Sequence, residues 1–271
     1  MSETILDKIF AAKKVRVEAA KRSIGLERMM ELAAVKRASG ENHRLRLALQ
    51  VPDRLNIIAE FKRASPSKGI INDSVDAATL ARSYKSGGAA AISVLTEEDF
   101  FKGSLDDLRA VRNAVDLPIL RKEFIFDAYQ IYEAAEAGAD AILLIAAMLE
   151  DEALVELHNL AEQVLGLDAL VEVHTLEELE LVKNVGAKLI GVNNRDLRTF
   201  NVSLNVSREL IKHAPKDAVM IAESGLTTRD DLMELQELGY SGFLIGETLM
   251  RSGDPETQLR VFAMENSEKR F

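Results

Sequence analysis

The sequence predicts an α/β fold, a (β/α)8 TIM barrel with an N-terminal helical extension, and three observations support this prediction. Eight short apolar runs recur from residue 55 onward, and segments with helical periodicity separate them. Several of these segments end in glycine just before the next apolar run. The chain has 271 residues, which suits one large barrel.

Residues 1–50 form the expected extension, and residues 51–271 form the barrel. The first fifty residues carry helical spacing and many charged side chains, without a strand-like run. The opening segment MSETILDKIFAAKK is amphipathic and has no apolar core of a signal peptide. The longest apolar run, residues 141–149, is too short to span a bilayer. We therefore expect a cytoplasmic protein that does not interact with membranes.

Eight strands are expected, and each coincides with one apolar run. In chain order they are Leu55–Phe61, Ala90–Leu95, Pro118–Leu120, Ala141–Ile145, Ala169–Val173, Leu189–Val192, Ala218–Ala222 and Gly242–Ile245. Strands that alternate with helices indicate a parallel sheet. An open doubly wound sheet is the alternative, but it usually brings a glycine-rich phosphate loop after its first strand. Neither GxGxxG nor GxxxxGK[ST] occurs, which favours the closed barrel.

Helices are expected between the strands, with the clearest spacing at Asp127–Ala137, Glu150–Leu165, Leu176–Val185 and Thr228–Leu238. A glycine follows several of the helical segments, at Gly87, Gly138, Gly186 and Gly239. Glycine just past a helix commonly adopts the left-handed conformation that turns the chain back. We expect that conformation at each of these positions.

Composition excludes several classes of function. Asp plus Glu total 44 against 34 Lys plus Arg, and this net charge of −10 disfavours sequence-independent binding of nucleic acid. The chain has no cysteine, which excludes disulfides and cysteine-ligated zinc. The four histidines lack the spacing of metal ligands, so we expect no metal site and place each histidine at the surface or at a strand end.

The segment IIAEFKRASPSKG, residues 57–69, runs from a buried strand into a polar loop. Side chains of a strand alternate between its faces, so Ile58, Glu60 and Lys62 share one face. Burying a carboxylate and an ammonium group is costly unless the two are paired or used in catalysis. The end of this strand therefore has the character of an active site.

The same alternation recurs at the ends of four other strands, where it gives Lys122, Glu172 with His174 beyond it, Asn193 with Arg195, and Glu223. Functional groups of a barrel gather at the C-terminal ends of its strands, so we expect these side chains to converge. Alternation alone does not decide which face points inward. A structural ring of salt bridges at the barrel mouth is the alternative interpretation.

The last two strands carry a second signal. Ser224 and Gly225 follow the seventh strand, and Gly246 and Glu247 follow the eighth. In many barrels the loops after these strands bind phosphate through backbone N–H groups, and glycine lets the backbone approach the anion. These residues predict a phosphate site. The alternative is that both glycines merely end their strands.

Seven motifs resemble the indole-3-glycerol-phosphate synthase family of tryptophan biosynthesis in its monofunctional form. They are IIAEFKRASPSKG, TEEDFFKGS, PILRKEFIFDAYQI, LVEVH, GVNNRDL, ESG and LIGETLM, spread over nearly the whole chain. The resemblance implies that 1-(2-carboxyphenylamino)-1-deoxyribulose 5-phosphate is converted to indole-3-glycerol phosphate, CO2 and water. It implies no cofactor and no metal. It also implies that the N-terminal helices lie over the barrel mouth.

The resemblance also implies roles for particular residues. Lys122 corresponds to the general acid and Glu172 to the general base, while Glu60 and Lys62 orient these groups and assist dehydration. Substrate contacts are expected from Asn193, Arg195, Glu223, Ser224, Phe101, Phe124 and Leu143. The phosphate site is expected at Ser65, Gly225, Gly246 and Glu247, with the Glu247 side chain pointing away from the phosphate.

The residue types fit this chemistry independently of the resemblance, since carbonyl addition and dehydration need acids and the restoration of aromaticity needs a base. Burial lowers the pKa of Lys122, but we expect the carboxylates of Glu60, Glu172 and Glu223 to raise it by more, so that Lys122 stays protonated at pH 7. Another phosphate-binding barrel enzyme, such as a sugar-phosphate isomerase, is the runner-up, and a barrel that only binds or scaffolds is the third hypothesis. The sequence leaves the oligomeric state open, with a monomer as the working expectation.

Overall fold

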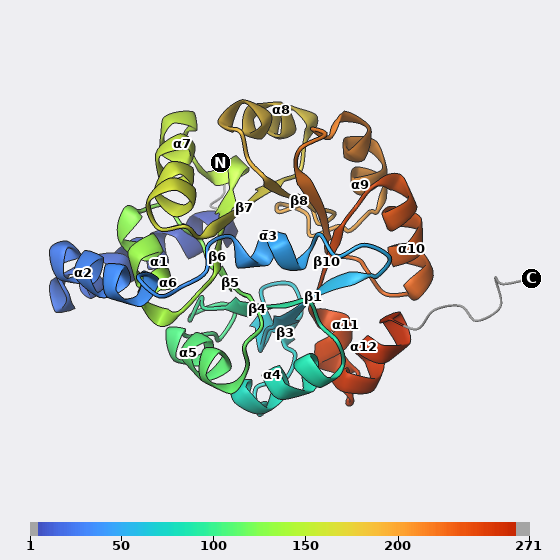
Figure 1. Ribbon diagram of the computed structural model, residues 1–271, viewed down its shortest axis with the longest axis horizontal. Helices are drawn as coiled ribbons and strands as arrows, with labels where there is room; N and C mark the ends of the chain where they lie inside the picture. The colour runs from blue at the N-terminus through green and yellow to red at the C-terminus, as the bar shows by residue number, and fades with distance from the viewer. Residues whose placement is uncertain (1–4, 264–271) are drawn as a thin grey trace, which may run out of the picture.

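Eight parallel strands close into a barrel in a computed structural model that describes residues 5–263 (Figure 1). The barrel strands are β1 (Asn56–Phe61), β4 (Ala91–Leu95), β5 (Ile119–Lys122), β6 (Ala141–Ile145), β7 (Asp168–Val173), β8 (Leu189–Asn193), β9 (Val219–Glu223) and β10 (Gly242–Ile245). Pairing of β10 with β1 closes the ring, for example at Ile57 and Phe243. The predicted (β/α)8 barrel is confirmed, and each strand lies within two residues of its expected bounds.

Helices surround the barrel (Figure 1). They are α4 (Ala77–Ser86), α5 (Leu105–Ala114), α6 (Ala128–Ala137), α7 (Asp151–Asn159), α8 (Leu176–Val185), α9 (Asn205–Leu210), α10 (Arg229–Leu238), α11 (Glu247–Arg251) and α12 (Pro255–Ala263). The expected helix at residues 150–165 is α7 followed by a π-helical turn, Leu160–Val164. Within residues 5–263, no helix is long and apolar enough to cross a membrane.

Glycine caps turn several helices back toward the barrel. Gly138, Gly186 and Gly239 have positive φ values, as expected for left-handed caps. The prediction for Gly87 was wrong, because its φ is −74° and the next residue, Gly88, takes the left-handed conformation at +89°. Gly87 is needed for another reason: a Cβ there would lie 2.8 Å from the Cβ of Leu259, so α12 could not pack as closely.

The strands bury side chains on both faces. One apolar cluster fills the space between the sheet and the helices and includes Ile57 and Phe61 of β1. A second cluster fills the barrel interior and includes Ile58, Leu120 and Leu170. The face that ends in polar residues is therefore the inward one. This alternation aims Glu60, Lys122 and their counterparts at a common point above the inner core.

Residues 5–50 contain three helices, which lie at different places on the barrel. Helix α1 (Ile5–Ser23) contributes Ile9 to a pocket at the C-terminal end of the barrel, and α2 (Leu26–Arg37) packs against α6. Helix α3 (Arg44–Ala48) lies across the opposite end of the barrel, where Leu45 and Leu49 join the inner core (Figure 1). Of these three helices, only α1 therefore covers the barrel mouth, while α3 closes the opposite, N-terminal end of the barrel.

An ion-pair cluster secures α3 to the barrel. The Arg46 side chain lies 3.6 Å from both Glu162 and Asp168, and its backbone N–H donates to Asp168. His43 lies 3.3 Å from the same aspartate. The expectation of surface or strand-end histidines was wrong for His158, which is buried on α7. Sequence spacing could not show His43 beside two distant carboxylates, but Arg46 already provides a cation for both of them.

Candidate active site

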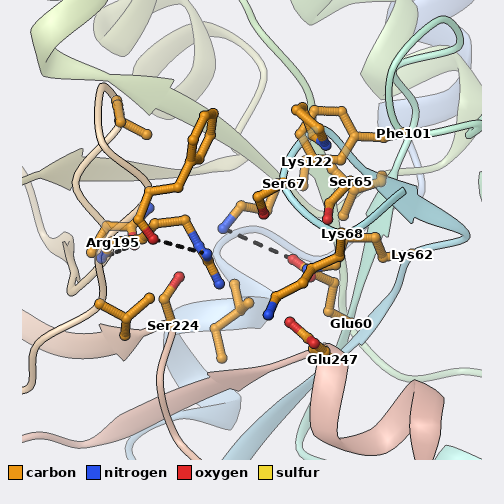
Figure 2. A pocket seen from close by; sticks show the side chains of 18 of the residues that line it. Glu60, Lys62, Ser65, Ser67, Lys68, Phe101, Lys122, Arg195, Ser224 and Glu247 are labelled. Atoms are coloured by element: carbon orange, nitrogen blue, oxygen red, sulfur yellow. Dashed lines mark hydrogen bonds and ion pairs between the residues drawn. The ribbon is translucent and has the colours of Figure 1, made fainter. Parts of the chain in front are cut away.

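A pocket of about 730 Å3 opens at the C-terminal ends of the strands (Figure 2). Almost every residue selected from the sequence lines it: Glu60, Lys62, Ser65, Phe101, Lys122, Phe124, Leu143, Glu172, Asn193, Arg195, Ser224, Gly225, Gly246 and Glu247. Glu223 is the exception, because it is buried behind Lys122 instead of forming the wall. These residues come from most of the barrel strands and from the loops that follow them, so residues far apart in the sequence meet in one pocket because the barrel closes.

The Lys122 ammonium group is surrounded by three carboxylates. It donates a short hydrogen bond to Oε2 of Glu223 and lies 3.6 Å from Oε2 of Glu172 and 4.0 Å from Oε2 of Glu60. Burial lowers the pKa of Lys122, but attraction by Glu223, Glu172 and Glu60 outweighs burial and raises the pKa. Lys122 therefore carries its proton at neutral pH, as expected from the sequence, and can donate it.

The charge pair at the end of β1 is a direct contact. The Lys62 ammonium group donates to Oε1 of Glu60 at 2.5 Å, and the Tyr84 hydroxyl donates to the Glu60 carbonyl at 3.0 Å. Burial raises the pKa of Glu60, but Lys62 and Lys122 outweigh that effect, so its pKa lies below the ordinary range. Glu60 thus remains an anion that holds the Lys62 ammonium group at the pocket wall.

Glu223 differs from the other carboxylates in its protonation. Burial raises its pKa to about 7, with further repulsion from Glu172 and Glu60, while Lys122 opposes the shift. It therefore exchanges a proton near neutral pH while remaining hydrogen-bonded to Lys122. This position suits a group that can return a proton to Lys122 after Lys122 has donated one.

Two glycines leave room for the buried carboxylates. A Cβ at Gly191 would overlap Oε1 of Glu223, and a Cβ at Gly246 would overlap Oε1 of Glu60. The interruption of the apolar pattern in β8 at Gly191 therefore has a steric reason. Gly246 was singled out for close approach of phosphate, but it also accommodates a carboxylate.

Two phenylalanines, Phe101 and Phe124, line an apolar wall of the pocket, and Phe101 lies across the pocket from Arg195 (Figure 2). The ring centroids of Phe101 and Phe124 are 6.0 Å apart. Glu97 is fully buried and accepts backbone hydrogen bonds from residues 99, 100 and 101, which shapes the loop that carries Phe101. Ile9 of α1 extends this wall, so the pocket has one side suited to an aromatic ring.

The polar side of the pocket lies at the loops after β1, β9 and β10. Ser65, Ser67 and Lys68 face Ser224 and Glu247 across it (Figure 2). Ser224 and Gly225 have φ values of +64° and +77°. Successive residues in this conformation can expose their N–H groups to an anion.

Glu247 lines the pocket at the start of α11, and the expectation that its side chain points away from the phosphate stays a prediction. Its carboxylate accepts a hydrogen bond from Arg251 at 3.1 Å. The two residues are one helical turn apart on α11, so this pairing was readable as an i, i+4 spacing. Arg251 and Lys68 also line this side of the pocket as cations, and neither was among the predicted phosphate-binding residues.

The two asparagines of the motif GVNNRDL point in different directions and have different functions. Asn193 lines the pocket and accepts from the Arg195 N–H at 3.0 Å, and Arg195 in turn donates to the Phe200 carbonyl. Asn194 instead points into the structure, where it donates to the carbonyl of Glu223 and accepts from Ser207. The second asparagine thus braces β8 against β9, and Phe200 is a pocket residue without a local sequence signal.

Comparison with known proteins identifies close relatives. A family model described as indole-3-glycerol phosphate synthase matches residues 6–262. The indole-3-glycerol phosphate synthase of Carboxydothermus hydrogenoformans is 46% identical over 267 residues, covering 94% of this chain and 98% of that protein. That of Syntrophobacter fumaroxidans is 46% identical over 256 residues, covering 94% and 95%.

Solved structures with low sequence identity share the fold. The 3-hexulose-6-phosphate synthase from Salmonella typhimurium has a TM-score of 0.61 at 12% identity, covering 77% of this chain and 96% of that one. The thiamine phosphate pyrophosphorylase from Pyrococcus furiosus has a TM-score of 0.58 at 17% identity, covering 80% and 95%. At such identities the likeness concerns the barrel alone.

Proposed function

The chain belongs to the indole-3-glycerol phosphate synthase family, and from this premise we propose how its pocket performs the reaction. It is a carboxy-lyase of tryptophan biosynthesis that acts on a small phosphorylated molecule. The substrate proposed is 1-(2-carboxyphenylamino)-1-deoxyribulose 5-phosphate. Ring closure, loss of CO2 and loss of water convert it to indole-3-glycerol phosphate.

The two sides of the pocket suggest the orientation of the substrate. The anthranilate ring packs between Phe101, Phe124 and Leu143, where apolar surface is available. The phosphate lies at the opposite side, against the backbone of Gly225 and the hydroxyl of Ser65. The ribulose carbonyl then lies between them, within reach of the Lys122 ammonium group.

Lys122 is the general acid of ring closure. It donates a proton to the carbonyl oxygen as the ring carbon bearing the carboxylate attacks the carbonyl carbon. CO2 then leaves, and its bonding electrons return to the ring and restore aromaticity. The raised pKa of Lys122 supports this role because the proton is present at neutral pH. Glu223 then returns a proton to Lys122, since the Glu223 pKa of about 7 allows proton exchange at neutral pH.

Dehydration requires an acid and a base. A second proton reaches the former carbonyl oxygen, which leaves as water, and we assign its delivery to Lys62 held by Glu60. Glu172 removes the proton from the methylene carbon beside nitrogen, which forms the double bond of the indole. With an ionised substrate carboxylate, each turnover consumes one proton from solvent overall.

The convergence of Lys122 with three carboxylates beneath an apolar wall is the observation that supports this mechanism. A sugar-phosphate isomerase would use an acid and a base but has no need for Phe101 and Phe124. The test is a single-turnover experiment that follows indole fluorescence with wild-type protein and with Glu172→Gln. A variant that closes the ring and loses CO2 but accumulates the undehydrated product supports the assignment, and an unchanged time course refutes it.

Two further expectations stay predictions. A cytoplasmic location is tested by fractionating cells of the source organism. A monomeric state is tested by analytical ultracentrifugation of the full chain.

A further inference from the structure

His174 lies just beyond β7, two residues after Glu172 and outside the set of reacting groups. Its Nε2 is 3.4 Å from Oε1 of Glu172, and its Nδ1 is 3.4 Å from Oε2 of Glu178 on α8. The backbone N–H of His174 also donates to the Glu178 carboxylate at 2.6 Å. Both ring nitrogens are buried, and within residues 5–263 neither has a hydrogen-bond partner of ordinary geometry, so their polar contacts are the two carboxylates at 3.4 Å.

The surroundings of the imidazole ring are anionic. Glu172 on its own strand, Glu178 on α8 and Glu223 on β9 all act on it. Lys122 on β5 is a cation beside Glu172, but it contacts Oε2 of that carboxylate, whereas His174 contacts Oε1. The side chains therefore form a row in the order Lys122, Glu172, His174 and Glu178, with alternating charge if the ring is protonated.

A neutral ring does not fit this row. A neutral imidazole has one N–H and one lone pair, so one of its nitrogens would face a carboxylate oxygen without a proton between them. A doubly protonated ring offers an N–H to each side. Burial lowers the pKa of His174, but the carboxylates of Glu178 and Glu172 outweigh burial and raise it above the ordinary value.

We propose that His174 is a positioning residue that holds the Glu172 carboxylate in its orientation, while Glu178 keeps the ring doubly protonated. This inference rests on the proposed role of Glu172 as a base. With one oxygen against Lys122 and the other against His174, the carboxylate has cations on both sides. Loss of the ring proton at high pH removes one of them and frees the carboxylate to rotate.

The test compares kcat and KM across pH for wild type, His174→Gln and Glu178→Gln, with His213→Gln as the matched control on the exposed helix end. We expect kcat of the wild type to fall on the alkaline side as the ring deprotonates. His174→Gln should lower kcat about tenfold at neutral pH, leave KM within about twofold and abolish that alkaline fall. Glu178→Gln should move the fall to lower pH, and the control should match wild type.

NMR titration of the His174 ring in the same variants reports its protonation without reference to activity. We expect a midpoint above the ordinary histidine value of about 6.5, and a lower midpoint in Glu178→Gln. A midpoint at or below that value, or a pH profile unchanged in His174→Gln, overturns the inference. Wild-type turnover by Glu172→Gln would instead refute the proposed base while leaving the ring titration intact, so the two failures are distinguishable.

Discussion

Replacement of Lys122 by methionine removes the proposed acid and keeps the length of the side chain. The ammonium group lies within 4.0 Å of three carboxylates, and a pair of opposite charges at about 4 Å is worth about 4 kcal/mol in a partly screened site. Without that cation, Glu223 loses its main stabilising partner, so its pKa rises above about 7 and it is protonated at neutral pH. Glu223 therefore takes up a proton, and Glu60 and Glu172 keep their contacts with Lys62 and His174, so the three carboxylates are not left as unpaired anions.

This proton uptake separates the effect on activity from the effect on stability. Loss of a positioned acid lowers kcat/KM about 10²–10⁴-fold, equivalent to about 2.7–5.4 kcal/mol in the transition state. The loss of stability should stay below the roughly 3–5 kcal/mol typical of a broken buried ion pair, because Glu223 becomes neutral.

Initial rates of indole fluorescence at pH 7.5, together with urea unfolding, measure both effects. Lys188→Met is the matched control, because its lysine pairs with Asp217 on the exposed surface away from the pocket. We expect the control to retain wild-type rates. A folded Lys122→Met variant with kcat/KM within tenfold of wild type would falsify the assignment of Lys122 as the acid.

Three further predictions follow from the same geometry. Gly191→Ala should lower kcat at least tenfold, because the added methyl group displaces the Glu223 carboxylate; wild-type kinetics together with an unmoved carboxylate in a crystal structure would contradict this. The Lys13 ammonium group of α1 lies 3.0 Å from buried Glu123, which also accepts from the Thr96 hydroxyl and lies 3.8 Å from Arg121. Lys13→Met should lower the free energy of unfolding in urea titration by up to about 3–5 kcal/mol, because Glu123 loses its closest cation, and a loss below about 1 kcal/mol would contradict the role of this pair. Burial raises the pKa of Asp168 to about 6, so the stability that this carboxyl group contributes is fully present below its unfolded pKa of about 3.8 and is lost as pH rises through 6. Asp168→Asn should therefore reduce the fall in the free energy of unfolding between pH 4 and pH 7, measured by urea titration. An equally steep fall in the variant would contradict the raised pKa.

The inward face of the strands was predictable because alternation is a local property of the chain. Glu60, Lys122 and Glu172 each follow an inward apolar residue by two positions, so the barrel topology brings them together without further information. The same rule selected Glu223 but could not show that it lies behind Lys122. That placement depends on the space left by Gly191 in the neighbouring strand.

Contacts between distant segments were not predictable from local pattern. Helical periodicity identified the N-terminal extension but not that α3 closes the base of the barrel, since any apolar surface could receive Leu45. Phe200 reaches the pocket from a loop after β8 that has no periodicity. The pairing of Glu247 with Arg251 is an exception, because it follows from an i, i+4 spacing on one helix.

The most direct test of the account is turnover of the carboxyphenylamino-deoxyribulose phosphate by the wild-type protein, with indole fluorescence and released CO2 measured together. The proposed mechanism predicts multiple turnovers without added metal or cofactor and one CO2 for each indole formed. Absence of indole fluorescence from folded wild-type protein, or indole formation that persists at the wild-type rate in Lys122→Met, would contradict it.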